Sequence, residues 1–301
     1  MVRILTLSVG LLFAICTQAQ SVIVLGVAQD GGFPHIGCQA KCQEIKDHPD
    51  LGRYVVSLAI VDSVSNRWWL MEATPDMPAQ LDYFQELTDG RYPYLPEGIF
   101  ITHAHIGHYT GLMFLGREAL GSKGVKVYAL PKLAEYIQQN GPWSQLVTLG
   151  NISLQEMETN SPIALTDQIS IEAFTVPHRD EFSKTAGFRF TAGSTSYLFI
   201  PDIDKWSKWE TDIRSLVKEV DIAFLDASFF ADGELPNRAM SEVPHPFVTE
   251  TIELFFDEPE SIRQKIHFIH LNHTNPLLWD RDIQDEVKKK GFRVAEQGEG
   301  Y

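Results

Sequence analysis

The densest group of metal-binding side chains in the sequence is a set of three histidines within six residues. His103, His105 and His108 directly follow the apolar segment 99–101, where a strand is expected to end. Neutral imidazole binds zinc, iron and manganese, and loops at strand ends commonly carry functional residues. One histidine alone is more often structural, but three on one loop can point at the same ion. The spacing therefore predicts a transition-metal site at this strand end.

Three more candidate ligands each lie at the end of another apolar, strand-like segment. His178, Asp202 and His270 close the segments 169–176, 196–200 and 266–271. Asp202 could bridge two ions, or it could instead cap a helix expected from residue 205. The sequence favours a first ion with four ligands, which are His103, His105, His178 and Asp202. A second ion would be held by His108, His270 and the shared Asp202.

These ligands must be positioned by short strands that alternate with helices. β-Branched and aromatic segments closed by Gly, Pro, Asp or Asn indicate strands, and apolar residues at helical spacing indicate helices. Strands are predicted at residues 21–28, 54–62, 68–72, 99–102, 125–129, 169–176, 188–191, 196–200, 222–226 and 266–271. Helices are predicted at residues 77–87, 110–120, 131–139, 205–220, 247–256 and 281–290.

The order of these elements predicts an α+β fold, with two mixed β-sheets packed face to face and helices outside. The first two strands precede any long helix, which argues against a doubly wound parallel sheet. Apolar residues make up 44% of the sequence, which is enough for a large core. Because no linker-like segment divides the chain, we expect one domain at residues 20–301.

The N-terminus has the features of a secretory signal peptide. Arg3 precedes the apolar segment 4–16, and small residues precede an expected cleavage site after Ala19. An uncleaved membrane anchor is the alternative, although the apolar segment is short for a membrane span. We expect residues 1–19 to be the signal peptide and the mature chain to be exported to the periplasm or the extracellular space. No stable membrane insertion is expected after cleavage.

Acidic residues outnumber basic residues in the predicted mature chain. Removal of Arg3 with the signal peptide leaves 24 Lys and Arg residues against 40 Asp and Glu residues, a formal charge of −16. A surface of this sign repels phosphate backbones over long distances, and no basic cluster in the sequence offsets it. The expected partner is therefore a small-molecule substrate and not a nucleic acid.

The ordered set of histidines and aspartate resembles the metallo-β-lactamase superfamily. The motif of that superfamily is His-x-His-x-Asp-His, followed by a histidine, an aspartate and a last histidine, each after a strand. The matching residues are His103, His105, His178, Asp202 and His270. The resemblance implies a four-layer αβ/βα sandwich with metal ions at the sheet edges. It also implies a metal-dependent hydrolase that contains zinc, with manganese or iron as alternatives.

Within this superfamily, the sequence is similar to the coenzyme PQQ synthesis protein B family. The similarity lies in the segments 31–34, 74–76, 201–204, 225–226 and 270–276. Segment 31–42 and the spacing of His270 and His273 also resemble a branch of cyclic-phosphate phosphodiesterases. These resemblances imply hydrolysis of a phosphodiester, an ester or a lactone. A role in cofactor biosynthesis and a non-catalytic metal-binding role are the alternatives.

The sequence departs from the superfamily motif at Gly107, where the motif has an aspartate. Glycine has no side chain that could bind a metal ion, so we predict one tightly bound ion and a second that is weak or absent. Water, Glu72 or Asp76 could fill the missing position. Glu72 could instead form hydrogen bonds with the histidine loop.

Two further side chains are expected to assist the reaction. His245 lies between two prolines before the helix predicted at residues 247–256, and it is either the general acid or a structural loop residue. Asp202 and His245 are thus the candidate catalytic residues. Asp226 ends the strand predicted at residues 222–226, and we expect it to orient a ligand histidine.

Cys38 and Cys42 remain after the predicted signal peptide is removed. They could form a separate structural zinc site with His273, and with His35 as a further ligand, because zinc accepts such nitrogen and sulfur ligands. The alternative is a disulfide between the two cysteines, which an oxidising compartment would favour.

Overall fold

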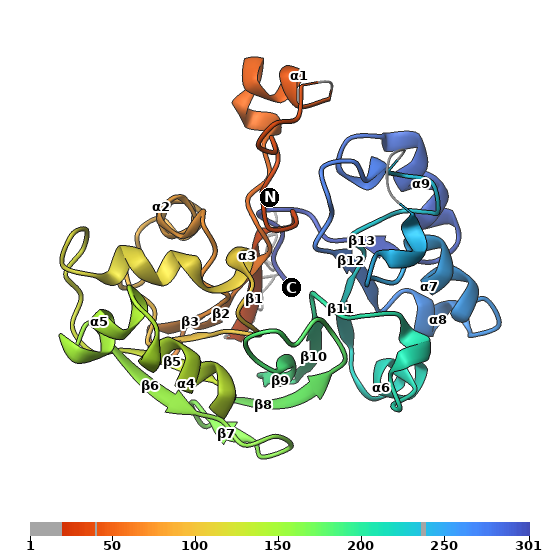
Figure 1. Cartoon of the computed structure of the whole chain (residues 1–301). Coiled ribbons are helices and arrows are strands. Elements are labelled where there is room, and N and C mark those ends of the chain that lie inside the picture. Colours follow the sequence, from red (N-terminus) through yellow and green to blue (C-terminus); the bar gives the residue numbers. More distant parts are fainter. Residues whose placement is uncertain (1–19, 40, 236–238) are drawn as a thin grey trace, which may run out of the picture.

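The structure is a computed structural model that describes residues 20–39, 41–235 and 239–301 (Figure 1). The predicted signal peptide at residues 1–19 lies outside the described residues. Among the helices that the structure describes, none is both long and apolar enough to cross a membrane. The described chain forms two β-sheets with helices beside each of them.

Both sheets are mixed, with antiparallel pairs on one side and parallel pairs on the other. The first sheet has the strand order β1-β2-β3-β4-β5-β6, and the second has the order β13-β12-β11-β10-β9-β8-β7. The first comprises β1 (Gln20–Gly26), β2 (Ser57–Asp62), β3 (Arg67–Met71), β4 (Gly98–Phe100), β5 (Val125–Ala129) and β6 (Ile152–Glu156). The second comprises β7 (Ile163–Ala164), β8 (Ile169–Val176), β9 (Thr185–Ala192), β10 (Thr195–Ile200), β11 (Ile222–Asp226), β12 (Ile266–Ile269) and β13 (Arg293–Val294).

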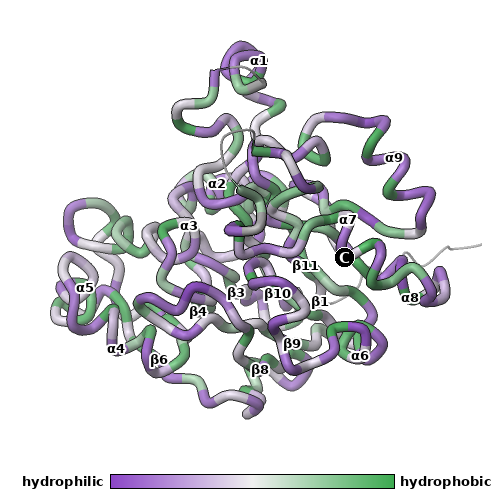
Figure 2. Tube along the Cα trace, turned by 45° about the vertical axis from the view of Figure 1, so that its right-hand side comes forward, coloured by the Kyte–Doolittle hydropathy of each residue, from purple (hydrophilic) through white to green (hydrophobic). Residues whose placement is uncertain are grey.

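Helices cover the outer sides of the sheets. In Figure 1, α2, α4 and α5 lie beside the first sheet, and α6 to α9 lie beside the second. The helices are α1 (Lys41–Asp47), α2 (Met77–Leu87), α3 (Ile106–Tyr109), α4 (Pro131–Gln139), α5 (Trp143–Thr148), α6 (Ile213–Glu219), α7 (Val248–Leu254), α8 (Glu260–Arg263) and α9 (Arg281–Lys289). Figure 2 colours α9 mainly hydrophilic, as expected for a helix with one face in solvent.

Neighbouring side chains of the first sheet pack into two different hydrophobic cores. Leu58 of β2 belongs to the core shared with the second sheet, whereas Ala59 belongs to the core shared with α2 and α4. Side chains alternate between the two faces of a strand, so both faces of this sheet are buried. Phe100 of β4 meets Phe188 of β9 across the sheets, with ring centroids 5.9 Å apart. The order of layers is helix, sheet, sheet, helix, which confirms the predicted four-layer sandwich.

Most predicted elements occur within a few residues of their expected bounds, but the helix predicted at residues 110–120 is wrong. This segment forms a short 3-10 helix (Thr110–Leu115) and then turns. A Cβ atom at Gly111 would lie 2.2 Å from the carbonyl oxygen of Thr74, so the backbone here packs too closely for a side chain. The helix predicted at residues 205–220 is shorter, because α6 begins only at Ile213. The prediction also missed β6, β7, β13, α1, α3, α5 and α8.

Candidate metal centre

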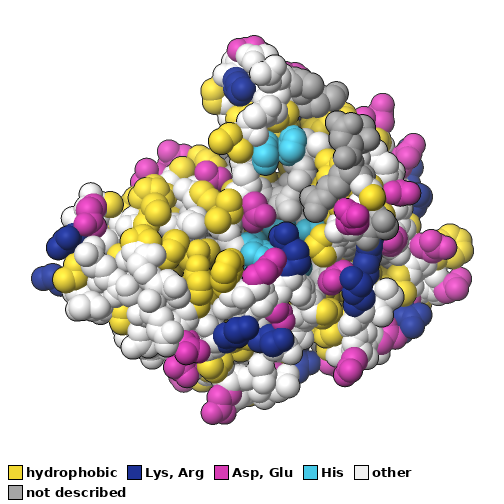
Figure 3. All heavy atoms as spheres, in the orientation of Figure 1, with side chains coloured by type: hydrophobic (Ala, Val, Ile, Leu, Met, Phe, Trp, Pro, Cys, Tyr) yellow, Lys and Arg dark blue, Asp and Glu magenta, His cyan; other side chains and the backbone are white. Residues whose placement is uncertain are grey.

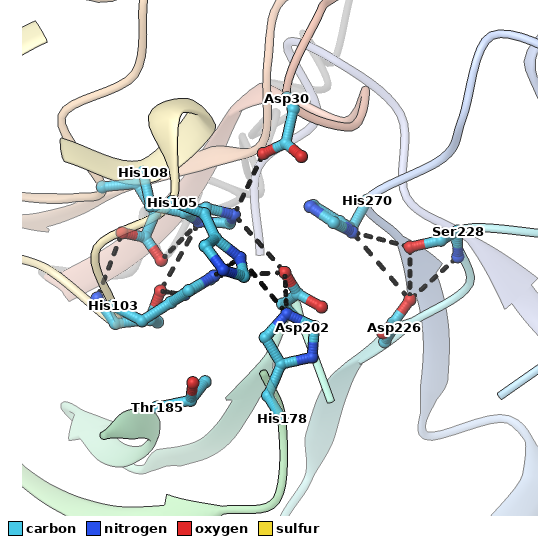
Figure 4. A network of polar contacts seen from close by, with 12 residues as sticks. Asp30, His103, His105, His108, His178, Thr185, Asp202, Asp226, Ser228 and His270 are labelled. Carbon is cyan, nitrogen blue, oxygen red and sulfur yellow. Dashed lines mark hydrogen bonds and ion pairs between the residues drawn. The ribbon is translucent and has the colours of Figure 1, made fainter. Parts of the chain in front are cut away.

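Loops after strands of both sheets bring the predicted ligands to one edge of the sandwich (Figure 4). His103 and His105 follow β4, His178 follows β8, Asp202 follows β10 and His270 follows β12. In the space-filling view of Figure 3, histidine side chains lie in a depression that acidic, basic and apolar side chains surround. The predicted ligands therefore converge at one edge, where His105 and His178 are partly exposed.

His103, His105, His178 and Asp202 offer four ligand atoms that all lie within 4.8 Å of one another. Oδ2 of Asp202 is 3.3 Å from Nε2 of His103 and 3.3 Å from Nε2 of His178. Nδ1 of His105 is 2.8 Å from Nε2 of His103 and 3.3 Å from Nε2 of His178. Ligand atoms at bonding distance from a tetrahedral zinc ion are about 3.4 Å apart, so this group can surround one ion. The structure thus brings together the four residues predicted for the first ion.

Polar partners behind two of these histidines orient their rings. Oε2 of Glu181 is 3.1 Å from Nε2 of His105, and Oγ1 of Thr102 is 2.9 Å from Nδ1 of His103. An imidazole that donates one ring N–H to a carboxylate keeps the lone pair of its other nitrogen. Nδ1 of His105 therefore presents a lone pair to the group, as a metal ligand must.

Burial keeps two of these imidazoles neutral. It lowers the pKa of His103 well below the usual value, with a further contribution from His108, and it also lowers the pKa of His105. Burial alone would raise the pKa of Asp202, but the charges of His178 and His245 hold that pKa well below its usual value. Neutral imidazoles beside an ionised carboxylate are the protonation states that bind a divalent cation.

Asp226, at the end of β11, is fully buried and holds the opposite side of the centre together. Its carboxylate accepts hydrogen bonds from the backbone N–H of Ile203 at 3.0 Å and from the Ser228 hydroxyl at 2.7 Å. Nδ1 of His245 is 2.9 Å from Oδ2 of Asp226, and Nδ1 of His270 is 2.8 Å from the Ser228 Oγ. Asp226 thus orients His245 directly and His270 through Ser228, in the manner predicted for it.

His245 lies inside the centre and not on an open loop. Its side chain is buried, and Nδ1 is 3.2 Å from Oδ1 of Asp202 as well as close to Asp226. Burial lowers its pKa, but the carboxylates of Asp226 and Asp202 outweigh this effect and raise the pKa to about 9. Asp202, Asp226, His245 and His270 form a second group whose ligand atoms lie within 4.8 Å of one another.

Asp30, which the sequence-based prediction missed, forms a third group with His108 and His270. It lies in the loop after β1, and its Oδ1 is 3.5 Å from Nε2 of His108. Its position after a predicted strand was the only signal in the sequence. Glu72 has the second of the two roles considered for it, because Oε2 accepts a hydrogen bond from the backbone N–H of Thr102 and Oε1 is 3.3 Å from Nδ1 of His108.

Asp76 does not join the centre. Its Oδ2 accepts a hydrogen bond from the backbone N–H of Val55 at 2.9 Å, and the ligand groups found among the described residues do not include it.

Glu72 and His270 have left-handed backbone conformations, with φ of +71° and +64°. Such conformations are uncommon for residues other than glycine and often occur at functional sites, where the surrounding structure maintains them.

The predicted zinc site at Cys38 and Cys42 is wrong, because the two sulfurs are joined in a disulfide. Their Cα atoms are 5.7 Å apart, a distance common in disulfides, and bonded sulfurs are no longer thiolate ligands. His273 stacks on His35 with ring centroids 4.1 Å apart, and no ligand group among the described residues contains either histidine. The disulfide was the stated alternative.

Comparisons with known proteins agree with this geometry. A family model described as "Beta-lactamase superfamily domain" matches residues 67–296. Coenzyme PQQ synthesis protein B of Rhizobium meliloti is 21% identical, over 94% of this chain and 97% of the relative. The protein of the same name from Gluconobacter oxydans is 25% identical, over 92% of this chain and 96% of the relative.

Two solved structures show a similar fold. Zn(2+)-bound PqqB from Methylobacterium extorquens has a TM-score of 0.76 at 20% identity, covering 93% of this chain and 99% of that chain. A diphosphatase from the PhnP family has a TM-score of 0.64 at 20% identity, covering 94% of this chain and 96% of that chain. Because the family model matches most of the chain and the layers agree, this chain belongs to the β-lactamase superfamily and has the metallo-β-lactamase fold.

Proposed function

We propose that this chain is a metal-dependent hydrolase that acts on a phosphodiester, an ester or a lactone of a small molecule. The observation that carries the proposal is the convergence of His103, His105, His178 and Asp202 within 4.8 Å. Three imidazoles and one carboxylate suit zinc, and the similar PqqB structure is described as zinc-bound. Manganese and iron are the alternative metals.

The chain's own groups have distinct roles in this proposal. A zinc ion held by the four ligands would lower the pKa of a bound water to about 7 and would polarise the bond under attack. Oδ2 of Asp202 lies 3.3 Å from Nε2 of both His103 and His178, so one carboxylate oxygen fixes the positions of both imidazoles. His245 is the proposed general acid: Asp226 holds its Nδ1, which leaves Nε2 to give a proton to the leaving group.

We propose a small molecule, and not a nucleic acid, as the substrate. The formal charge of the whole chain is −15, and the depression over the histidines is bordered by acidic as well as basic side chains (Figure 3). Charge of this sign disfavours long-range attraction of a phosphate backbone.

His105→Ala tests the hydrolase proposal, because it removes one ligand of the first ion from a partly exposed position. We expect less bound metal and a decrease in kcat/KM of at least about 100-fold, since loss of even an outer partner of a metal ligand costs up to that much. Metal content by mass spectrometry and hydrolysis of a chromogenic phosphodiester and a lactone provide the measurements. His48→Ala, at an exposed histidine, is the matched control.

A role in cofactor biosynthesis is the second candidate, because both curated relatives described above are named coenzyme PQQ synthesis protein B. Such a role needs a redox metal such as iron, and it is expected in the cytoplasm. Iron with oxygen-dependent chemistry would support this candidate, whereas zinc or manganese with hydrolysis supports the first. Bound metal without turnover of any tested substrate would indicate a non-catalytic protein.

We also propose that the chain is exported. The disulfide between Cys38 and Cys42 supports this, because disulfides persist in oxidising compartments. Mass spectrometry of a periplasmic or culture-medium fraction should find a mature chain that begins at Gln20. A chain that keeps residues 1–19 and sediments with membranes would instead support an uncleaved anchor.

A further inference from the structure

The space where the motif aspartate would lie is already filled by another carboxylate. A Cβ atom added to Gly107 would lie 2.1 Å from Oδ1 of Asp30, 2.7 Å from its Cα and 3.0 Å from its Cγ. A side chain at position 107 would therefore overlap with Asp30. Since Asp30 comes from the loop after β1 and Gly107 from the loop after β4, two distant segments share one position at the centre.

Four buried atoms around this position have no hydrogen-bond partner among the described residues. They are Oδ1 of Asp30, Nε2 of His108, Nε2 of His270 and Oδ1 of Asp202. Two of these atoms have ion-pair contacts only: Oδ1 of Asp30 is 3.5 Å from Nε2 of His108, and Oδ1 of Asp202 is 3.2 Å from Nδ1 of His245. Leaving a buried polar atom unsatisfied costs about 1–3 kcal/mol, so several together suggest that a ligand completes the site.

Both imidazoles are held from behind in the orientation that a metal ion requires. Oε1 of Glu72 is 3.3 Å from Nδ1 of His108, and the Ser228 hydroxyl, which donates to Asp226, is 2.8 Å from Nδ1 of His270. Nδ1–H of His270 is thus donated to Ser228, which leaves its Nε2 lone pair facing inward, and the Glu72 carboxylate lies against the Nδ1 side of His108 so that Nε2 of His108 also points inward. Figure 4 shows both rings on the sides of a space that Asp30 and Asp202 also face.

We propose that Asp30 supplies the carboxylate ligand that position 107 cannot, so that the centre binds two metal ions. The ligands of the second ion are Asp30, His108, His270 and the shared Asp202, whose Oδ2 is 3.7 Å from Nε2 of His108. This inference rests on the proposed function for the first ion. It differs from the expectation of a weak or absent second ion, for which water, Glu72 or Asp76 were considered at the missing position but Asp30 was not.

An exchange of the two positions tests this inference. Asp30→Ala should lower the affinity for the second ion by at least about 100-fold, since loss of an outer partner already costs up to that much. Gly107→Asp alone should lower the Tm, because its side chain meets Asp30. The double variant Asp30→Gly with Gly107→Asp removes the overlap with the Asp30 side chain and returns a carboxylate, so it should again bind two ions. Its Tm should stay below that of the wild type, because the new Cβ still lies 2.7 Å from the Cα of residue 30 and the loop must shift. Asp50→Ala, at an exposed carboxylate of the same N-terminal region, is the matched control.

The measurement is zinc bound per chain after equilibrium dialysis at fixed free zinc, with thermal unfolding as a check of the fold. Two ions in the wild type, one in Asp30→Ala and two in the double variant support the inference, whatever the turnover. Two ions in folded Asp30→Ala, or a single ion in the wild type, would overturn it. Hydrolysis by a one-ion wild type would still support the proposed function, and two ions without hydrolysis would oppose that function alone, so the two failures are distinguishable.

Discussion

Replacing Asp202 with alanine is expected to remove both metal ions and to lower kcat/KM by at least about 10³-fold. Asp202 faces both ligand groups, with Oδ2 3.3 Å from Nε2 of His103 and 3.7 Å from Nε2 of His108. A catalytic metal supplies several kcal/mol of transition-state stabilisation, and about 4 kcal/mol corresponds to a factor of about 10³ in rate. Metal content and steady-state hydrolysis of the same preparation measure the two effects.

Asp202→Asn separates the charge of the side chain from its size. The amide fills the same space and can accept a hydrogen bond, but it cannot neutralise two cations, so we expect the variant to fold and still to bind metal weakly. Asp202→Ala also removes the carboxylate 3.2 Å from Nδ1 of His245, which keeps Asp226 at 2.9 Å, so the metal-free protein should lose about 1.5–3 kcal/mol of unfolding free energy. Urea unfolding in the presence of a chelator measures this. Wild-type metal content in the alanine variant would contradict the assignment.

The first ligand group could be predicted from the sequence because each member ends an apolar segment. His178 follows β8 and Asp202 follows β10, so the pattern of strands alone indicated where these side chains would lie. The order of histidines and aspartate then matched a known motif. The same strand-like segments predicted two mixed sheets, because the first two precede any long helix. Two of these segments, β2 and β3, are buried along almost their whole length.

Asp30 could not be predicted in the same way, because its role depends on a contact between distant segments. The sequence showed that Gly107 lacks a side chain, but it did not show which residue lies against that glycine. The packing of Gly111 against the backbone of Thr74 is a further contact of this kind. Local patterns predict helices, strands and strand ends. The residue that replaces a missing side chain, such as Asp30 beside Gly107, can be identified only from the three-dimensional structure.

Asp226 connects the parts of the centre that come from the second sheet. It accepts a hydrogen bond from the loop of Asp202, through the N–H of Ile203. It also accepts one from the Ser228 hydroxyl in its own loop, and that hydroxyl contacts Nδ1 of His270. Burial raises its pKa, but the charge and hydrogen bond of His245 lower that pKa below its usual value. The buried carboxylate of Asp226 thus positions the metal ligand His270 through Ser228, and the proposed general acid His245 directly. It also fixes the loop that carries Asp202.

Asp226→Ala is therefore expected to affect stability as much as metal binding. Removal of one partner of a buried charged pair costs about 3–5 kcal/mol of unfolding free energy, and loss of an outer partner of a metal ligand weakens metal binding about 10–100-fold. Asp226→Asn retains the size and should lose metal affinity with a smaller loss of stability. Urea unfolding without metal and zinc titration measure the two effects separately.

Asp257→Ala is the matched control, because Asp257 is exposed and surface substitutions usually change stability by less than about 0.5 kcal/mol. If Asp226→Ala were no less stable than this control, the buried carboxylate would not be the connection between the two loops. If stability fell but zinc affinity per folded chain did not, Asp226 would support the fold without orienting His270. The combination of both losses is the result expected of a residue that positions metal ligands.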